Sequence, residues 1–235
     1  GTSPFFSASA VFTAILPQSQ GPAQSAGPIR AKSAILYDLD RRVVLYEQNA
    51  DARVPPASLT KIMTALVVLE SDHDLDNETT ELKTYIQNYL YNLQAGDGGI
   101  YQGVQFTLRD LLYGSLTQSV NAAAMMLADY VGNGSIEDFC VMMNQKAKEM
   151  GAKNTHFSNP TGLYIEGEEN YTTAYDMALI TRYALGTPNF LQYFGQTEYS
   201  MEPTNKQSLP RNWRRNSDES MMLSSSENYY NGILG

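Results

Sequence analysis

The sequence predicts an α+β domain in which an antiparallel sheet is flanked by a helical block. Three observations support this class. Two short runs of β-branched and aromatic residues stand near the beginning, helix signals dominate residues 108–185, and short strand-like runs and turns fill residues 187–235. Chains that segregate strands from helices in this way form α+β domains. The sheet is therefore expected to draw its strands from both ends of the chain.

The first expected element is a β-hairpin. Residues 34–39 (AILYDL) and 43–47 (VVLYE) have strand composition, and the three polar residues between them suit a tight connection. Pro55-Pro56 then ends the second strand. From Ala57 onward the apolar residues recur on one helical face, which they share as Ile62, Met63, Ala65, Leu66 and Leu69.

Helix-start signals recur through the middle of the chain. Ser or Thr is followed three residues later by an acidic residue at Thr107/Asp110, Ser135/Asp138 and Thr173/Asp176, a spacing typical of a capping box. Glycines at 132, 151 and 186 stand where helical patterns end. Residues 108–185 are therefore expected to be mainly helical, with a loop at 152–172. Further strands are expected near residues 197–201 and 221–223.

The first 29 residues differ from the remainder of the chain. They carry no charged residue, and residues 5–16 (FFSASAVFTAIL) form an apolar run between two prolines. This run is shorter than the ~20 residues that cross a bilayer, but it fits the ~7–15 residues of a signal-peptide core, although the basic segment is missing. We expect residues 1–29 to be a clipped signal peptide or a disordered leader, and residues 30–235 to form the folded domain.

Composition excludes several classes of function. The chain has 235 residues, with 16 Lys+Arg against 25 Asp+Glu and a formal net charge of −9. This balance argues against nucleic-acid binding, because phosphate contacts need a basic surface. A single cysteine, Cys140, excludes an internal disulfide and a cysteine-based zinc site. Two histidines leave little room for a histidine-rich metal site.

Ser58 and Lys61 form the first candidate catalytic pair. Ser58 begins an expected helix and Lys61 follows three residues later, so both side chains face the same way. A serine hydroxyl becomes a good nucleophile when a neighbouring base takes its proton. Lysine can be that base where its surroundings lower its pKa. The plainer interpretation is a helix-capping serine followed by a surface lysine, although no other serine here has lysine at this spacing.

Ser119 and Asn121 form a second candidate element. They stand in Ser119-Val120-Asn121, where the helical pattern from residue 108 gives way to the one ending near residue 131. A hydroxyl and an amide in such a connection can relay a proton and hold a substrate carbonyl. Ser-x-Asn is a weak signal alone, because Ser226-Glu227-Asn228 also fits it.

Together these motifs resemble those of the penicillin-interacting serine enzymes, in which Ser-x-x-Lys is followed by Ser-x-Asn. Residues 31–235 resemble one branch, the low-molecular-mass penicillin-binding proteins or serine-type D-alanyl-D-alanine carboxypeptidases. The similar stretches are 46–51, 56–64, 111–128 (LLYGSLTQSVNAAAMMLA), 150–163 (MGAKNTHFSNPTGL), 171–185 and 211–216. The resemblance implies a β-lactamase/transpeptidase-like fold and identifies residues 30–235 as a catalytic domain.

One feature of that family is missing from the sequence. Its third motif, Lys-Thr-Gly, lines the active site on a strand, and no Lys-Thr-Gly occurs here. Residues 229–235 (YYNGILG) are similar to the approach to that motif. We therefore expect a domain that is C-terminally incomplete, truncated before its last strands and helix, and a chain that is inactive or poorly folded by itself.

The resemblance also implies a mechanism. The enzyme removes the terminal D-Ala from peptidoglycan stem pentapeptides during cell-wall remodelling, with Ser58 as nucleophile and acyl-ester site, Lys61 as general base, Ser119 as proton relay and Asn121 as substrate-binding residue. β-Lactam antibiotics would be covalent inhibitors. No metal, organic cofactor or nucleic acid is implied. The protein is expected to be exported to the extracytoplasmic face of the bacterial membrane, the cell wall or the periplasm, with any membrane association made through a segment absent from this chain.

Two alternative functions remain open at this point. A class A-like β-lactamase needs a carboxylate to activate water, and the acidic run Glu166-Gly167-Glu168-Glu169 offers one. An exposed acidic loop is the simpler interpretation of that run. A non-catalytic wall-binding or partner-binding domain would explain the missing Lys-Thr-Gly. Turnover of a penicillin separates the first alternative from a carboxypeptidase, and ligand binding without acylation identifies the second.

Overall fold

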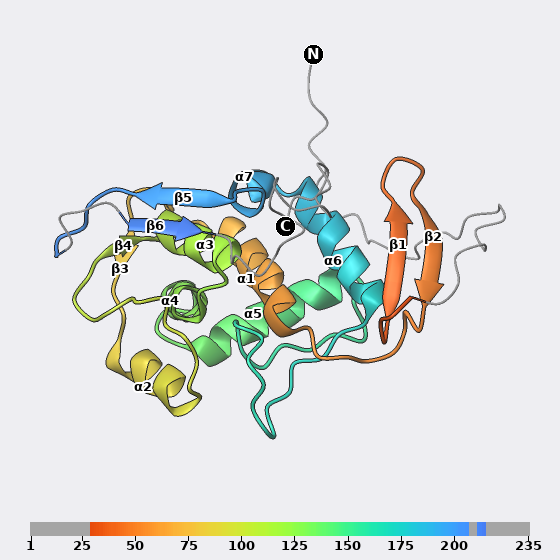
Figure 1. The fold of residues 1–235 in the computed structure, drawn as a ribbon, viewed down its shortest axis with the longest axis horizontal. Coiled ribbons are helices and arrows are strands. Elements are labelled where there is room, and N and C mark those ends of the chain that lie inside the picture. Colours follow the sequence, from red (N-terminus) through yellow and green to blue (C-terminus); the bar gives the residue numbers. More distant parts are fainter. Residues whose placement is uncertain (1–28, 207–210, 215–235) are drawn as a thin grey trace, which may run out of the picture.

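A block of helices forms the centre of the molecule, with a pair of strands at each end (Figure 1). The computed structural model describes residues 29–206 and 211–214. The helices are the 3-10 turn η1 (Ala57–Leu59), α1 (Thr60–Leu69), α2 (Thr84–Asn92), α3 (Leu108–Thr117), α4 (Asn121–Val131), α5 (Ile136–Glu149), α6 (Ala174–Gly186) and α7 (Phe190–Phe194). The strands are β1 (Ala34–Asp38), β2 (Val43–Gln48), β3 (Thr79–Thr80), β4 (Phe106–Thr107), β5 (Glu198–Met201) and β6 (Arg211–Arg214).

Two central helices form the main core. α1 is buried from Thr60 to Val68, and Met63, Leu66 and Val68 have no appreciable solvent exposure. α4 packs against it and opens with three buried alanines at 122–124, whose small side chains permit close approach. A helix that is apolar on all sides is stable only when other elements surround it. α1, the helix that follows Ser58, is therefore held rigidly at the centre of the fold.

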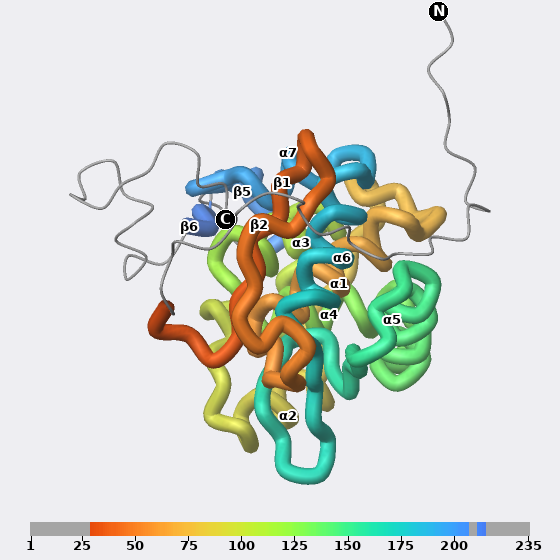
Figure 2. The backbone as a smooth tube through the Cα atoms, turned by 90° about the vertical axis from the view of Figure 1, so that its right-hand side faces the viewer, coloured from red at the N-terminus to blue at the C-terminus, as the bar shows by residue number. Residues whose placement is uncertain are grey.

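The described strands form three separate two-stranded antiparallel sheets, β1–β2, β3–β4 and β5–β6. The expectation of one sheet with strands from both ends of the chain is not met within the described residues. The reason is packing: β1–β2 lies against α6, where Val44 contacts Leu179, whereas β5–β6 lies on α3. Figure 1 shows the two pairs at opposite ends of the helical block, and Figure 2, in which the hairpin faces the viewer, shows α6 running beside it.

Most local predictions are confirmed. The α+β class, the hairpin, the helical stretch over 108–185 with its loop at 152–172, and the strand near 197–201 are all present. One detail differs: Ser58 lies in the 3-10 turn η1, and the α-helix itself begins at Thr60. The strand expected at 221–223 and, apart from Ile29, the expected leader lie outside the described residues. None of the described helices is long and apolar enough to cross a membrane.

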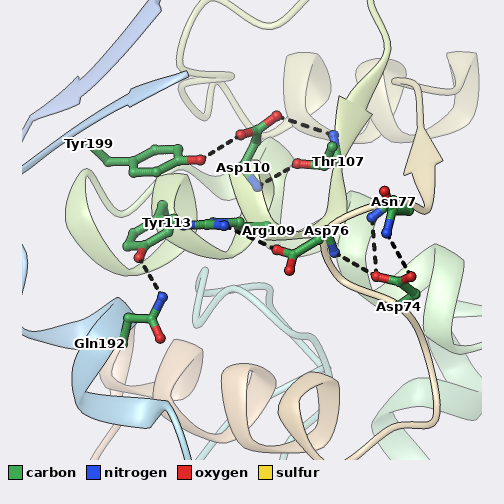
Figure 3. A network of polar contacts seen from close by, with 9 residues as sticks. All are labelled: Asp74, Asp76, Asn77, Thr107, Arg109, Asp110, Tyr113, Gln192 and Tyr199. Atoms are coloured by element: carbon green, nitrogen blue, oxygen red, sulfur yellow. Dashed lines mark hydrogen bonds and ion pairs between the residues drawn. The ribbon is translucent and has the colours of Figure 1, made fainter. Parts of the chain in front are cut away.

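A polar network fixes the start of α3 (Figure 3). Thr107 and Asp110 form the predicted capping box, in which each side chain accepts a hydrogen bond from the other residue's backbone N–H. The hydroxyl of Tyr199, on β5, donates to Asp110 Oδ1 at 2.9 Å. Arg109 pairs with Asp76 at 3.2 Å. These contacts join α3 to β5 and to the 74–78 turn, so the far end of α3, which leads to Ser119, has a fixed position.

Trp213 anchors the β5–β6 pair on the same helix. Its side chain is fully buried, and the indole N–H donates to the backbone carbonyl of Asp110 at 3.1 Å. Gly114 makes room for it, since a Cβ at that position would lie 2.8 Å from the indole ring. The strand pair therefore braces α3 close to the connection that carries Ser119.

Candidate active site

Ser58 is presented on the exposed turn η1, directly ahead of the buried helix α1. Ala57, the residue before it, has a φ of +49°, in the left-handed region that residues with a Cβ rarely adopt. Such backbone strain persists only where the surrounding structure enforces it, and it is concentrated at functional sites. The turn leaves the Ser58 side chain exposed while α1 fixes the backbone beneath it.

Lys61 lies one turn further along, and its side chain is buried. Its exposed fraction is 2%, and Nζ lies 3.3 Å from Ser58 Oγ. Nζ also donates to the carbonyl oxygen of Thr161 at 2.8 Å. Burial lowers the pKa of Lys61 from its ordinary 10.5 to about 8, because the charged ammonium loses its hydration. At pH 7 about one molecule in ten therefore carries the neutral amine that can accept a proton.

Ser119 approaches Ser58 from the connection between α3 and α4. Its Oγ donates to Ser58 Oγ at 3.0 Å, across a separation of 61 residues in sequence. Ser119 also has a left-handed backbone, with a φ of +55°. Asn121 is the first residue of α4 and is half-buried. The structure thus brings both Lys61 and Ser119 into direct contact with Ser58, and Asn121 follows Ser119 by two residues. The roles predicted for these four residues stay predictions.

The loop at 159–163 supplies a contact that the motif analysis missed. Thr161 binds the lysine through its backbone carbonyl, so its side-chain type gave no signal. The carbonyl of Pro160 accepts a second bond, from Thr64 Oγ1 at 2.7 Å. Gly162 has a φ of +85°, and a Cβ there would lie 1.8 Å from the carbonyl oxygen of Ala57. The sequence Asn159-Pro160-Thr161-Gly162, which includes turn-forming residues, was the one available signal.

The hydrogen bonds of Ser58 Oγ go to Lys61 and Ser119, and not to the acidic run. Glu166, Glu168 and Glu169 are exposed, as the simpler interpretation of that acidic run predicts. His156 stacks on Tyr171 with 5.8 Å between the ring centres. Within residues 29–206 and 211–214, no group of three or more His, Cys, Asp or Glu side chains could hold a metal ion.

The geometry favours nucleophilic chemistry at Ser58. An exposed hydroxyl contacts a buried lysine whose pKa is lowered and a second hydroxyl that can carry a proton. A nucleophile within hydrogen-bond reach of a base, with the base oriented by a third group, is the general arrangement of covalent catalysis. Here the third group is the Thr161 carbonyl.

Known proteins support this interpretation. A sequence model of the D-alanyl-D-alanine carboxypeptidases, peptidase family S11, matches residues 19–229. The chain is 38% identical over 179 residues to the D-alanyl-D-alanine carboxypeptidase DacF of Bacillus subtilis, covering 75% of this chain and 44% of that protein. It is 35% identical over 182 residues to DacA of Escherichia coli, covering 73% and 43%. The chain thus spans less than half the length of these two relatives.

Solved structures show the same likeness in three dimensions. A Streptomyces DD-transpeptidase mutant superposes with a TM-score of 0.78 at 29% identity, covering 89% of this chain and 80% of that one. A D-alanyl-D-alanine carboxypeptidase from Mycobacterium tuberculosis gives 0.72 at 31% identity, covering 90% and 74%. The fold is therefore that of the DD-transpeptidases and penicillin-binding proteins, and the sequence match shows that this chain belongs to the D-alanyl-D-alanine carboxypeptidase family of serine peptidases.

Proposed function

We propose that this chain carries the catalytic machinery of a serine D-alanyl-D-alanine carboxypeptidase, which removes the terminal D-Ala from peptidoglycan stem peptides. The observation that carries the proposal is the contact of Ser58 Oγ with both Lys61 Nζ, at 3.3 Å, and Ser119 Oγ, at 3.0 Å. Family membership supports the substrate class, since the family is described by its action on D-alanyl-D-alanine.

Acylation begins when Ser58 Oγ attacks the carbonyl carbon of the penultimate D-Ala. Neutral Lys61 takes the hydroxyl proton, and the carbonyl electrons move onto its oxygen. The backbone N–H of Ser58 is one proposed donor to that oxyanion. When the C–N bond breaks, Ser119 gives its proton to the departing D-Ala amine and recovers one from Lys61. The products are a free D-Ala and an ester on Ser58.

Deacylation returns the enzyme to its starting state. Water attacks the carbonyl carbon of the Ser58 ester and loses a proton to the neutral Lys61. When the bond to Ser58 Oγ breaks, Lys61 returns that proton to Oγ, and the shortened peptide leaves as a carboxylic acid. Asn121 is the proposed contact for the acyl group, because it begins α4 two residues after Ser119. β-Lactams offer a strained amide to the same nucleophile, so they should acylate Ser58 as well.

The setting follows from the substrate. An enzyme that trims stem peptides acts outside the cytoplasm, at the cell wall, and would contribute to cell shape. We therefore propose that the protein is exported to the extracytoplasmic face of the membrane, the wall or the periplasm.

Mass spectrometry after incubation with benzylpenicillin tests the proposal. An adduct of one penicillin mass is expected on the wild-type chain and none on Ser58→Ala. Ser71→Ala is the matched control, because Ser71 follows the other end of α1 and its hydroxyl bonds only backbone, at Val68 O 2.7 Å away. If a folded wild-type chain forms no adduct, the proposal fails for this chain.

Product analysis separates the related activities. A long-lived adduct, with D-Ala released from a D-Ala-D-Ala-terminated peptide, identifies a carboxypeptidase. Rapid loss of the adduct with hydrolysis of the penicillin identifies a β-lactamase. Cleavage of crosslinked peptide dimers without D-Ala release identifies an endopeptidase, an activity named for relatives from Pseudomonas aeruginosa and Escherichia coli that are 37% and 34% identical.

A further inference from the structure

The side chain of Asn159 is the centre of the loop that contacts the lysine. It is 2% exposed. Its Oδ1 accepts from the N–H of Thr161 at 3.1 Å, the hydroxyl of Thr161 at 2.9 Å and the N–H of Gly162 at 2.8 Å. Its Nδ2 donates to the carbonyl of Leu163 at 3.0 Å. One amide group therefore satisfies backbone groups of three successive residues and holds them in a tight turn.

A second buried amide supports the first. Asn170 Nδ2 donates to Asn159 Oδ1 at 3.2 Å. Its Oδ1 accepts from the N–H groups of Ser158 at 2.6 Å and of Asn159 at 3.2 Å. These bonds join the two ends of the 158–170 segment. The Asn159 side chain therefore cannot rotate without breaking its hydrogen bonds to Asn170 and to the 161–163 backbone. Buried polar networks that are fully satisfied in this way are rigid.

The turn around Asn159 meets the catalytic segment at three points. The Thr161 carbonyl accepts from Lys61 Nζ, the Pro160 carbonyl accepts from Thr64 Oγ1, and Gly162 lies against the carbonyl of Ala57. The contacts to residues 161 and 162 are the ones that Asn159 fixes directly. The turn thus binds the lysine and also lies against the strained residue next to Ser58.

We propose that Asn159 is a positioning residue for the acyl-transfer reaction: its side chain holds the 160–162 turn against α1, so that the Thr161 carbonyl orients Lys61 Nζ and water is kept from it. This inference rests on the proposed function for its catalytic meaning. Asn159 makes no contact with Ser58 in the described structure, so it acts through Thr161. The reacting atoms remain those of Ser58, Lys61 and Ser119.

The charged groups near the 158–170 segment bear on the pKa of Lys61. Burial is the cause of the lowered pKa of Lys61. Three carboxylates on the same segment, Glu166, Glu168 and Glu169, are exposed. The buried carboxylate of Asp176, on α6, is bonded to Thr155 and to the N–H of Asn154. None of these carboxylates is bonded to Lys61. If opening of the turn admits water to Lys61, hydration of the ammonium should raise the pKa of Lys61 toward 10.5.

Direct titration of Lys61 tests this without requiring catalysis. The chain is labelled with 13C-lysine, and the Cε resonance that is missing from Lys61→Arg is followed against pH. In Asn159→Ala, the pKa of Lys61 should rise by at least one unit. Asn144→Ala is the matched control, because Asn144 also makes two amide hydrogen bonds to this part of the chain, both to Phe157 at 2.8 Å. It should lose comparable stability and leave the pKa of Lys61 unchanged.

Acylation kinetics give an independent readout. At pH 7, Asn159→Ala should be acylated by benzylpenicillin about tenfold more slowly for each unit by which the pKa of Lys61 rises. The deficit should shrink as the pH is raised to 9.5, because the neutral fraction of Lys61 is then already saturated in the wild type and still grows in the variant. Should Asn159→Ala not fold, Asn159→Ser replaces it, since its hydroxyl can still accept a hydrogen bond but lacks the Nδ2 group that donates to the carbonyl of Leu163.

Three outcomes would contradict these claims, two of them the positioning role and one the proposed function. An unchanged pKa of Lys61 in a folded Asn159 variant overturns the positioning role, whatever the stability loss. Absence of a penicillin adduct on the wild-type chain overturns the proposed function, while the lysine titration still reports on the turn. A rate deficit that stays constant from pH 7 to 9.5 also contradicts the inference, because it shows that lysine protonation is not what Asn159 controls.

Discussion

Lys61 Nζ lies 2.8 Å from the carbonyl oxygen of Thr161, a residue 100 positions later in the chain. This bond joins the first turn of α1 to the 159–163 turn. The lysine that makes it is buried and also contacts Ser58. Burial of that ammonium makes the amine a usable base and also costs stability.

Replacing Lys61 with methionine should stabilise the folded chain at pH 7. Lowering a lysine pKa from 10.5 to about 8 costs about 3 kcal/mol of folding free energy, against which the lost bond to Thr161 is worth ~1 kcal/mol. A net gain of about 1–2 kcal/mol in the free energy of unfolding is expected. Urea unfolding at pH 7 measures it, and an equal or lower midpoint would contradict the prediction.

The same substitution should change the pH dependence of stability. Between pH 8 and 10.5 the unfolded wild-type chain binds more protons at Lys61 than the folded chain does. Its free energy of unfolding therefore rises with pH across this window relative to Lys61→Met. The advantage of the variant should be full below pH 8 and should narrow by pH 9.5. Parallel urea titrations at pH 7 and 9.5 measure this difference.

The rate of acylation should follow the neutral form of Lys61. Below its pKa of about 8, the second-order rate constant with benzylpenicillin should rise about tenfold per pH unit and level off above it. Stopped-flow or quenched mass measurements from pH 6 to 9 provide the profile. A rate that is flat from pH 6 to 8 would show that another group is the base.

Removing the Ser119 hydroxyl should slow acylation and leave the fold intact. Ser119→Ala loses the contact to Ser58 Oγ, and a fall of ~10²-fold or more is expected for a lost proton relay. Ser119→Gly should be equally slow but about 1 kcal/mol more stable, because glycine relieves the left-handed backbone at φ +55°. Adduct formation and thermal unfolding distinguish the two effects. Equal stability of the two variants would argue against strain at this position.

Gly162 and Gly167 form a matched pair for testing the turn. Both have a left-handed φ, +85° and +84°, but a Cβ at Gly162 meets the Ala57 carbonyl at 1.8 Å whereas Gly167 faces open space. Gly167→Ala should lose ~1 kcal/mol from backbone strain alone. Gly162→Ala should lose at least ~2 kcal/mol and should also slow acylation, because the turn must move away from Ser58. Equal effects of the two substitutions would show that this close approach is unimportant.

Local signals in the sequence were sufficient for most elements. The hairpin follows from β-branched residues around a polar connection, and the starts of α3, α5 and α6 follow from Thr107, Ser135 and Thr173, whose side chains accept from the backbone three residues on. These signals act between neighbours in the chain, so they can be recognised without a fold. Strand pairing is different, because it depends on where the strands pack.

Among the described residues, the way in which the strand pairs are arranged could not be predicted from the sequence. The hairpin and the β5–β6 pair carry ordinary strand patterns, which say nothing about their partners. Trp213, buried against Gly114, fixes the second pair on α3 instead. Likewise, the left-handed backbones of Ala57 and Ser119 occur in residues that seldom adopt them, so tertiary contacts must enforce them.

The sequence by itself determined the chemical groups of the candidate site, because a serine, a lysine three residues later and a distant Ser-x-Asn are recognisable by type and spacing. Only the tertiary structure decided what makes that lysine a base. Burial lowers the pKa of Lys61, and Nζ is bonded to a backbone carbonyl, that of Thr161, in a turn held by the side chain of Asn159. The burial of Lys61 depends on how the whole chain packs, and its partner is a backbone carbonyl, a group that every residue carries. Residue types alone therefore could not predict either one.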